Sequence, residues 1–433
     1  GGRRSSIIGC LMTSPRATRR ALGSASTLSV VLLLAATSVV TPTSLSSRPK
    51  TPHPGSRPAT SDRARIGTLD VPSIGLGTIK WSPGNAHDVD RLKRTFDAAL
   101  TEDLTFFDSA ERYGASIPSL VQGALRSVGV GSEEQAFGSG SGEELLGSFV
   151  QGAKAGSAGT KGCMVATKFT PVPWRRDSQS VVDACRASAE RLGVASVDLY
   201  QIHMPDVVQP FRRFGREHIK DVDYWDGLAE CYHQGLTRNV GVSNYGPTLL
   251  ERAHAHLAAK GVPLSSNQIN FSLLYRKKGS QATVDRCLEL GVTPLAYYPL
   301  AMGVLSGKWD ASNLPPDRGL HPYLIGDQGR GIPKGGVQPL VDTLRAVAEQ
   351  RGCTPAQVSL NWVLCKGAVA IAGASRPEHI SSNAGALGWR LDESEVALLE
   401  AAADACGFDF EGSGLKTSDS KFVGYGFEKW ALD

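Results

Sequence analysis

The sequence predicts an α/β protein built as a (β/α)8 TIM barrel, and three observations carry this prediction. The composition is that of an ordinary globular protein, with 41% hydrophobic residues in a chain of 433, which is enough to bury a large core. From Ile66 onward, short β-rich runs alternate with segments of helical hydrophobic spacing, as in parallel sheets with crossover helices. The alternation repeats eight times, and eight such units close a barrel.

Each predicted strand is a short β-rich run. The eight runs occupy residues 74–78, 105–108, 164–169, 197–203, 239–243, 266–270, 293–297 and 368–372. Between and after them, apolar residues recur at helical spacing, as Leu92, Phe96 and Leu100 do in the first helix. The predicted helices occupy residues 88–100, 143–150, 179–192, 224–233, 248–259, 282–290, 340–350, 355–365, 378–387 and 393–403.

Residues 1–64 have the composition of a targeting leader and a disordered linker, so we place the barrel domain at residues 65–406. No Asp or Glu occurs before Asp62, whereas Arg, Ser, Thr and Pro are frequent, as in transit peptides. The apolar run at residues 28–40 is shorter than the about 20 residues of a membrane span, and it also suits a signal peptide. We therefore expect a plastid (chloroplast) location after leader removal, with another organelle or the secretory route as the alternative.

Three segments of the chain do not fit the repeat of strand and helix. Residues 126–142 are rich in Gly and Ser, and they predict an exposed insertion between the second strand and its helix. Residues 302–339 predict a long loop after the seventh strand, and loops of that length are usually functional or disordered. The tail at residues 407–433 carries six aromatic residues, and it either lines a pocket or packs on the surface.

The formal net charge of +4 is small and unevenly placed along the chain. It does not indicate nucleic acid or a membrane surface as a partner, and we expect no stable membrane insertion of the mature chain. The eight cysteines are scattered without a C-x-x-C pair, so neither a zinc site nor a disulfide framework is indicated. A reducing compartment such as cytosol or stroma fits this pattern best. The sequence gives no indication of the oligomeric state.

Four polar side chains lie at or just beyond the ends of three predicted strands. Asp108 ends the second strand, and Tyr113 follows it by five residues. Lys168 lies near the end of the third strand, and His203 ends the fourth. Reacting groups in such barrels sit past the C-terminal ends of the strands, so all four are expected to converge on one mouth. Each alone has a simpler interpretation, namely a loop anchor, a snorkelling lysine or a core histidine.

Together the four residues form one coherent acid site. The ordinary pKa of tyrosine is about 10, so a tyrosine that donates a proton at neutral pH needs help from a nearby positive charge. Lys168, held by an ion pair with Asp108, would supply that charge. His203 would orient a carbonyl oxygen beside the Tyr113 hydroxyl, which is geometry for reducing an aldehyde or ketone. A hydride source is still required.

Seven segments, taken in order, resemble the aldo-keto reductases over about residues 65–403, and most of all their plastid-targeted and potassium-channel β-subunit-like branches. The segments are FFDSAERYG, VATKF, DLYQIHMP, VGVSNY, NQINFSLLYR, AYYPLAMGVLSGKW and IAGASRPEHISSNAGAL. The resemblance implies the (β/α)8 fold, with the four strand-end residues as a catalytic tetrad and Tyr113 as the general acid. It also implies NADPH as the hydride source.

The resemblance assigns twelve further positions to NADPH. They are Ser243, Asn244 and Gln268 at the nicotinamide carboxamide, Tyr297 on the ring, Pro299 and Leu300 at the pyrophosphate, Lys308, Arg318, Ser375 and Arg376 at the phosphates, and His379 and Asn383 at the adenine. Basic groups at a 2′-phosphate favour NADPH over NADH. By contrast, Gly75-x-Gly77 lacks the third glycine of a dinucleotide fingerprint, so we assign it no cofactor role.

We therefore predict an NADPH-dependent aldo-keto reductase that transfers hydride to a small-molecule aldehyde or ketone. The alternative is an NADPH-binding regulatory or scaffold protein that resembles a potassium-channel β-subunit. Metal-assisted chemistry has no support, because no cluster of His and carboxylates falls at strand ends. Substrate choice in such barrels lies in the βα loops, where apolar side chains indicate a partly apolar pocket, with core packing as the other interpretation. These side chains are Trp81, Trp174, Phe211 and Phe214.

Overall fold

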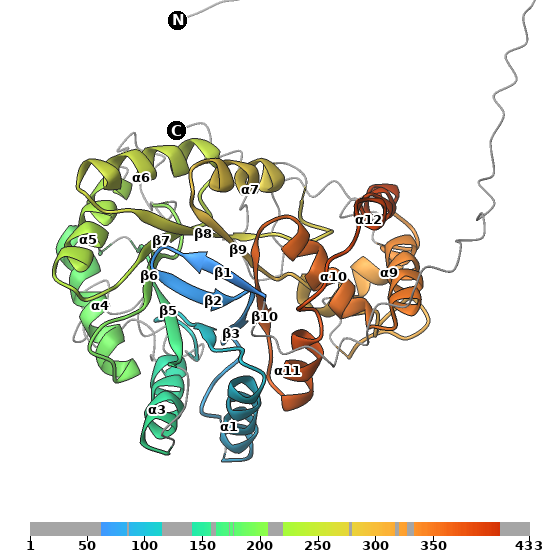
Figure 1. The fold of residues 1–433 in the computed structure, drawn as a ribbon, viewed down its shortest axis with the longest axis horizontal. Helices are drawn as coiled ribbons and strands as arrows, with labels where there is room; N and C mark the ends of the chain where they lie inside the picture. Colours follow the sequence, from blue (N-terminus) through green and yellow to red (C-terminus); the bar gives the residue numbers. More distant parts are fainter. Residues whose placement is uncertain are drawn as a thin grey trace, which may run out of the picture. The chain divides into compact units, whose positions relative to one another are not determined.

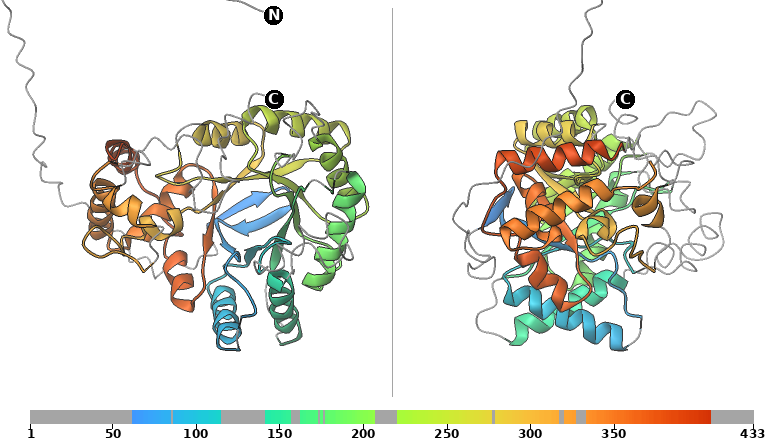
Figure 2. Two further views of the ribbon diagram at one scale, coloured as in Figure 1. Left: turned by 180° about the vertical axis from the view of Figure 1, so that it is seen from behind. Right: turned by 90° about the vertical axis from the view of Figure 1, so that its right-hand side faces the viewer.

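The computed structural model describes a closed barrel of eight parallel strands with helices around it (Figures 1 and 2). The residues it describes are 62–84, 86–114, 141–156, 162–172, 174–175, 177–206, 220–276, 279–316, 320–326 and 333–407. Neighbouring strands follow the order β10-β3-β4-β5-β6-β7-β8-β9, so strands consecutive in sequence pair in space and the last pairs with the first. This arrangement confirms the predicted (β/α)8 fold.

The eight predicted strands are all present as β3 to β10, two of them with the predicted bounds. The strands are β3 (Ile74–Gly77), β4 (Phe106–Asp108), β5 (Met164–Phe169), β6 (Leu199–Ile202), β7 (Val240–Ser243), β8 (Leu264–Asn270), β9 (Thr293–Tyr297) and β10 (Val369–Gly373). All pair in parallel, so their C-terminal ends share one side of the barrel.

The predicted helices are also present, and most begin or end within a few residues of the prediction. They are α1 (Ala86–Thr101), α3 (Ser141–Gly156), α4 (Ser178–Leu192), α5 (Asp221–His233), α6 (Pro247–Ala259), α7 (Ser280–Glu289), α9 (Gln338–Arg351), α10 (Pro355–Cys365), α11 (Pro377–Ala384) and α12 (Glu393–Ala405). Local sequence signals determine where several of these helices begin or end. Thr354 begins α10 with a capping box, and Gly193 ends α4 in the left-handed region at φ 63°.

Two of the segments that did not fit the repeat differ from the prediction. The predicted insertion at 126–142 overlaps α3, because Ser141 and Gly142 form its first turn, while residues 115–140 lie outside the described part. The chain enters and leaves that segment at adjacent points, since Ser141 Oγ donates to the Gly114 carbonyl at 2.8 Å. The predicted loop at 302–339 contains a 3-10 helix, η4 (Ala301–Ser306), and the short helix α8 (His321–Ile325).

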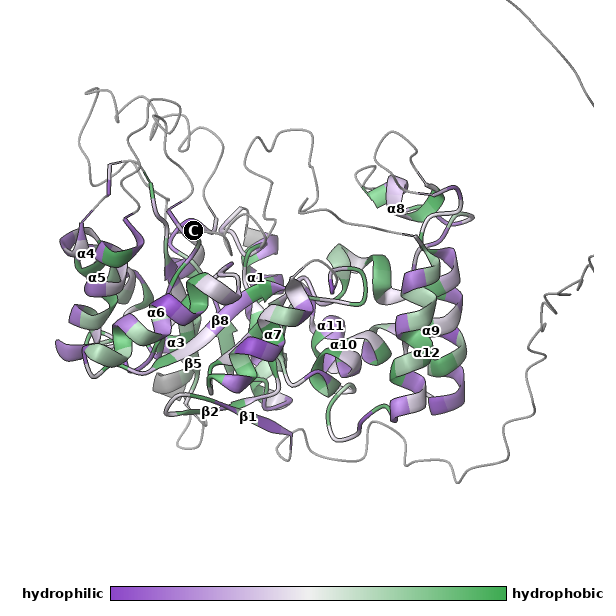
Figure 3. Cartoon of the chain, turned by 90° about the horizontal axis from the view of Figure 1, so that it is seen from above, coloured by the Kyte–Doolittle hydropathy of each residue, from purple (hydrophilic) through white to green (hydrophobic). Residues whose placement is uncertain are grey.

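An antiparallel hairpin, β1 (Arg63–Ile66) and β2 (Leu69–Pro72), precedes the barrel and was not predicted. It lies at the opposite edge of the barrel from α8 (Figure 3). Its Ile66, Leu69 and Val71 side chains pack against strand residues that face the barrel interior, such as Phe106 and Leu199. The hairpin therefore closes the end of the barrel where the strands begin.

The fold reaches further toward the N-terminus than the predicted boundary at residue 65. The Asp62 carboxylate accepts two hydrogen bonds from Arg390, at 2.5 and 2.7 Å, and one from the Ser73 hydroxyl at 2.9 Å. These contacts tie the residue before β1 to the start of β3 and to the segment before α12. Residues 62–64 are thus part of the barrel domain, while 1–61 lie outside the described residues.

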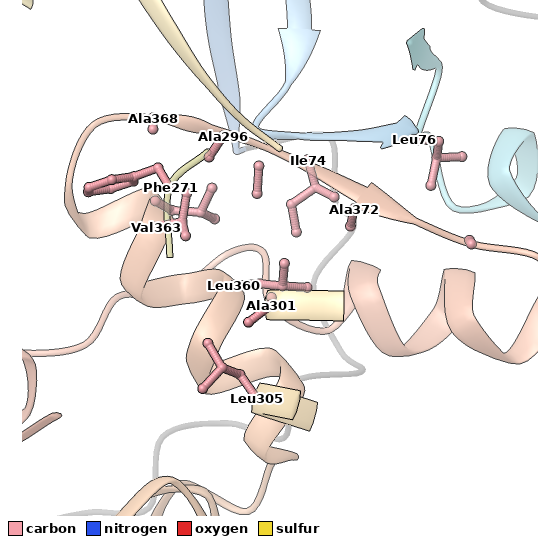
Figure 4. Close-up of a cluster of buried hydrophobic side chains, with 14 of the residues drawn as sticks. Ile74, Leu76, Phe271, Ala296, Ala301, Leu305, Leu360, Val363, Ala368 and Ala372 are labelled. Carbon is pink, nitrogen blue, oxygen red and sulfur yellow. The ribbon is translucent and has the colours of Figure 1, made fainter. Parts of the chain in front are cut away.

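The core between β3, β9, β10 and α10 contains small and branched apolar side chains together with the aromatic ring of Phe271 (Figure 4). A Cβ at Gly75 would lie 2.6 Å from Phe106 Cδ1, so close packing accounts for this glycine. Trp81 is fully buried in this core and its Nε1 donates to the Ala374 carbonyl at 2.7 Å. Core packing therefore explains Trp81, whereas the Trp174 side chain is 43% exposed. Phe211 and Phe214 lie outside the described residues.

Candidate active site

The four predicted strand-end residues come together at the C-terminal side of three neighbouring strands. Asp108 is the last residue of β4, Lys168 lies one residue before the end of β5, and His203 follows β6 directly. β4 pairs with β5 and β5 with β6, so the three side chains are neighbours. Tyr113 joins them from the turn after β4, with its ring 5.9 Å from that of His203 at an interplanar angle of 76°.

A fully buried ion pair forms the floor of this group. Lys168 Nζ donates to Asp108 Oδ2 at 2.6 Å and to the Ser109 carbonyl at 2.8 Å. The other carboxylate oxygen, Asp108 Oδ1, accepts from Gln268 Nε2 at 2.9 Å. Burial lowers the pKa of Lys168, and the negative charge of Asp108 opposes that effect. Asp108 is thus fully engaged as the partner that keeps the lysine in place.

The Tyr113 ring lies above this ion pair, with Lys168 Nζ 5.2 Å from the ring centroid. The surrounding protein removes water from the hydroxyl and raises the pKa of Tyr113 well above its ordinary value, and the charge of Asp108 adds to the increase. The sequence led us to expect that the positive charge of Lys168 would dominate. Instead, loss of solvent dominates, so Tyr113 holds its proton firmly at neutral pH.

His203 is neutral in this environment. Desolvation lowers its pKa well below the ordinary value, and the positive charges of Lys168 and Arg112 lower it further. Its Nδ1 atom is inaccessible to solvent and has no hydrogen-bond partner among the residues that the structure describes. A neutral imidazole beside a protonated tyrosine can orient an oxygen atom without taking the proton itself.

Four of the positions assigned to the nicotinamide end form one hydrogen-bonded network beside this group. Asn244 Nδ2 donates to the His203 carbonyl at 3.0 Å, and Asn244 Oδ1 accepts from the Tyr297 hydroxyl at 2.8 Å. The Ser243 hydroxyl donates to the carbonyl of Gln268, at 2.8 Å. Asn244 lies in the left-handed region at φ 64°, which asparagine tolerates better than most residues. The network reaches Asp108 through Gln268.

The remaining positions assigned to the cofactor gather around the start of α11 and the segment after β9. Pro299 and Leu300 directly precede η4, and Ser375 and Arg376 directly precede α11. Asn383, on α11, is only 4% exposed, and its Nδ2 atom has no hydrogen-bond partner in the described part of the chain. Arg318 lies outside the described residues.

Positive charge collects around His379 on α11. Desolvation lowers the pKa of His379, and the charges of Arg376, Lys308 and Lys80 lower it further. Arg376 and Lys308 are both exposed, as expected for groups that meet an anionic ligand. Lys80 was not assigned a role from the sequence, because it lies in a loop without a distinctive motif.

Sequence reasoning also missed Gln201. This fully buried residue lies on β6, and its Nε2 donates to Asp108 Oδ1 at 3.5 Å. It precedes His203 by two residues, and residues two apart on a strand share one face. A polar residue in an otherwise apolar strand, in phase with a candidate histidine, was the signal available.

Within the described ranges, no group of three or more His, Cys, Asp and Glu side chains is arranged to hold a metal ion. In the same ranges, every helix is too short or too polar to cross a membrane.

A buried carboxylate beside the site makes stability depend on pH. Asp221 begins α5, is 3% exposed, and accepts from the Tyr245 hydroxyl at 2.8 Å. Burial, together with the charge of Asp206, raises the pKa of Asp221 to about 6. The folded protein therefore favours the protonated form, and the stabilisation present at low pH is lost as pH rises from about 4 to about 6.

Replacing Asp221 by Asn should remove this dependence, because the amide oxygen still accepts from Tyr245 but never ionises. We expect the free energy of unfolding of Asp221→Asn, relative to wild type, to rise by about 3 kcal/mol between pH 4 and pH 7. Urea titrations at several pH values measure this difference. A difference that stays constant across the range would contradict the prediction.

The fold and the mouth define a class: a barrel enzyme in which a protonated tyrosine, a neutral histidine and a buried lysine–aspartate pair surround one point. Comparison with known proteins places the chain within that class. A model of the Aldo/keto reductase family matches residues 73–404. The chain belongs to the aldo/keto reductase family, and it is an oxidoreductase.

Individual relatives agree with this assignment. The chain is 35% identical over 349 residues to a chloroplastic pyridoxal reductase of Arabidopsis thaliana, covering 79% of this chain and 86% of that protein. It is 29% identical to an aldo-keto reductase of Strobilurus tenacellus, covering 78% and 91% of the two chains.

Solved structures share the fold at lower identity. A glycerol dehydrogenase of Gluconobacter oxydans is 22% identical with a TM-score of 0.60, covering 80% of this chain and 96% of that one. An aldo-keto reductase of Bombyx mori in complex with NADP is 21% identical with a TM-score of 0.54, covering 78% and 92%. These likenesses support the barrel fold.

Proposed function

We propose that this protein is an NADPH-dependent reductase of aldehydes or ketones in which Tyr113 is the general acid. One observation carries the proposal. The Tyr113 ring lies at the barrel mouth, 5.9 Å from the His203 ring and over the buried Lys168–Asp108 pair, with Lys168 Nζ 5.2 Å from its centroid. A tyrosine hydroxyl beside a group that orients a carbonyl oxygen suits carbonyl reduction. The relatives named above are reductases or dehydrogenases, which does not favour the regulatory alternative.

The residues present fit NADPH as the cofactor. The buried, unpartnered Nδ2 of Asn383 suits an acceptor nitrogen of an adenine ring, and the exposed Arg376 and Lys308 suit a 2′-phosphate. Ser243, Asn244 and Gln268 would hold the carboxamide, with Tyr297 against the ring. The pyrophosphate would meet Pro299 and Leu300, with Ser375 and Arg318 at the phosphates and His379 at the adenine. When bound, NADPH supplies the hydride.

The residues of the chain then position the carbonyl group and supply one proton to its oxygen. His203 orients the carbonyl oxygen, and the Tyr113 hydroxyl donates its proton to that oxygen as negative charge develops on it. The phenolate left on Tyr113 is stabilised by Lys168, whose Nζ is 5.2 Å from the ring centroid. Asp108 keeps Lys168 in place for this role.

For the substrate we propose a flat aromatic aldehyde of the pyridoxal type. The pyridoxal reductase relative suggests this class. Two large apolar side chains on loops that flank β4 support it, since Ile79 after β3 is 45% exposed and Trp174 after β5 is 43% exposed. We further propose a plastid location, based on the leader composition of residues 1–61 and on the chloroplastic relative.

A substrate panel tests this function. The full-length protein should oxidise NADPH, followed by its absorbance, when given pyridoxal, other aromatic aldehydes and simple ketones in turn. We expect turnover with pyridoxal, and at least about tenfold higher kcat/KM with NADPH than with NADH, because Arg376 and Lys308 would pair with the 2′-phosphate that NADH lacks. Absence of turnover with every carbonyl, despite tight NADPH binding, would reject the reductase and favour the regulatory alternative.

A further inference from the structure

A second buried ion pair lies next to the active site, between Glu111 and Arg175. Arg175 Nη1 donates to Glu111 Oε1 at 2.7 Å and Nη2 donates to Oε2 at 3.1 Å. Glu111 Oε1 also accepts from the Thr170 backbone N–H at 2.6 Å. We infer that Glu111 and Arg175 form a positioning pair that holds the Tyr113 hydroxyl in register with Lys168. This inference rests on the proposed function.

Backbone hydrogen bonds also tie the Tyr113 turn to its surroundings, among them that from Gly142 N–H to the Tyr113 carbonyl at 3.1 Å. The residues after β4 extend its hydrogen bonding with β5. Ser109 N–H donates to the Ala166 carbonyl at 2.8 Å, and Glu111 N–H donates to the Lys168 carbonyl at 3.4 Å. The second of these bonds is long and therefore weak. The Glu111 side chain adds a short contact between the Tyr113 turn and the end of β5, where Thr170 N–H donates to it at 2.6 Å.

The surroundings of the Glu111–Arg175 ion pair restrict the positions of both side chains. Its side chains are only 5% and 17% exposed, and the contact is bidentate and charged on both sides. The Arg175 guanidinium carbon lies 4.4 Å from the Phe169 ring centroid, which fixes the plane of the fork against the last residue of β5. One anchor at the end of β5 therefore serves both Tyr113 and Lys168. The same anchor holds the loop that presents Trp174.

Glu111 and Arg175 act on Tyr113 through the turn, and they take no part in proton transfer. Their effect on the reaction comes from placement, and displacement of a reacting group by about 1 Å can cost about a hundredfold in rate. A purely stabilising ion pair would change the folded fraction without changing the rate of the folded enzyme. The rate of the folded enzyme therefore distinguishes a positioning role from a purely stabilising one.

A matched control exists at the other end of the barrel. Arg390 and Asp62 also form a bidentate pair, at 2.5 and 2.7 Å, and Asp62 is likewise nearly buried. It lies beside the start of β3, away from the mouth. Asp62→Asn therefore removes the same kind of contact without touching the Tyr113 turn.

The experiment compares full-length Glu111→Gln and Asp62→Asn with wild type. For Glu111→Gln we expect kcat with pyridoxal and NADPH to fall about 10- to 100-fold while the Kd for NADPH stays within twofold. For Asp62→Asn we expect a similar loss in Tm but a kcat within twofold of wild type. Arg175→Lys is the second variant, for use if Glu111→Gln does not fold. It keeps the positive charge but loses the bidentate contact, so we expect a smaller fall in kcat, again with an unchanged Kd for NADPH.

A readout independent of turnover comes from NMR of protein labelled with 13C at the ζ carbon of tyrosine. The Tyr113 resonance, assigned by its absence in Tyr113→Phe, should move in Glu111→Gln and stay in place in Asp62→Asn. An unmoved resonance in Glu111→Gln, or an unchanged kcat in that variant, would overturn the positioning role. If wild type reduces no carbonyl, the proposed function fails separately, and the resonance alone decides the positioning role.

Discussion

Tyr113→Phe is expected to lose nearly all carbonyl reduction while the barrel stays folded. The substitution removes one oxygen atom and keeps the ring that lies against His203 and over Lys168. Without the hydroxyl, the proton that Tyr113 would donate to the carbonyl oxygen is missing. General acids typically contribute 10²- to 10⁴-fold to rate, so we expect kcat to fall by about that range. Steady-state oxidation of NADPH with pyridoxal measures the loss.

Tyr200→Phe is the matched control for this variant. Tyr200 is a fully buried tyrosine on β6 that packs in the cluster between the barrel and its outer helices, and its hydroxyl makes only a long contact, 3.5 Å, to the Val181 carbonyl. It should keep wild-type kcat. Retention of more than about a tenth of the wild-type kcat by Tyr113→Phe would remove Tyr113 from the role of general acid.

Lys168→Met should have the second large effect, on stability and turnover together. The variant leaves the Asp108 carboxylate buried with hydrogen bonds only from amide side chains. Removing one partner of a buried ion pair typically costs 3 to 5 kcal/mol, so we expect a decrease of about that size in the free energy of unfolding. Turnover should fall as well, because the phenolate on Tyr113 loses its nearby positive charge. Urea unfolding and NADPH oxidation measure the two effects.

Adding Asp108→Asn to Lys168→Met separates the two effects. The double variant has no charge at positions 108 and 168, and its Asn side chain still accepts from Gln268. We therefore expect most of the stability to return and the turnover to stay low. Recovery of turnover along with stability would mean that Lys168 acts only as a structural partner. Wild-type stability in Lys168→Met alone would contradict the cost assigned to the unpaired carboxylate.

The parts of the fold that the sequence predicted well have strong local signals. β5 and α10 have the predicted bounds, because β5 is a compact apolar run and α10 starts at a Thr-Pro pair with a capping Gln three residues on. The hairpin of β1 and β2 has no such signal. Its strands have four residues each, and they are held by distant contacts such as that of Thr68 with Asn239, 171 residues away.

The residues of the candidate site also differ in how far the sequence could predict them. Residues at strand ends could be found from the sequence, because barrel topology alone brings Asp108, Lys168 and His203 to one side. The pairing of Glu111 with Arg175 could not, since it joins two loops 64 residues apart whose paths depend on packing. The direction of the Tyr113 pKa shift was also inaccessible, because the amount of water removed from the hydroxyl is a property of the folded chain.

The contact between Gly114 and Ser141 bears on the chain length that this position of the barrel can accept. Gly114 lies directly after Tyr113, and Gly142 N–H donates back to the Tyr113 carbonyl at 3.1 Å, so the chain departs and returns at almost one point. Closing a loop between fixed ends costs only about 0.6 kcal/mol more each time its length doubles. The length of chain between Gly114 and Ser141 can therefore change at a small cost in loop-closure free energy, because both ends stay fixed beside Tyr113.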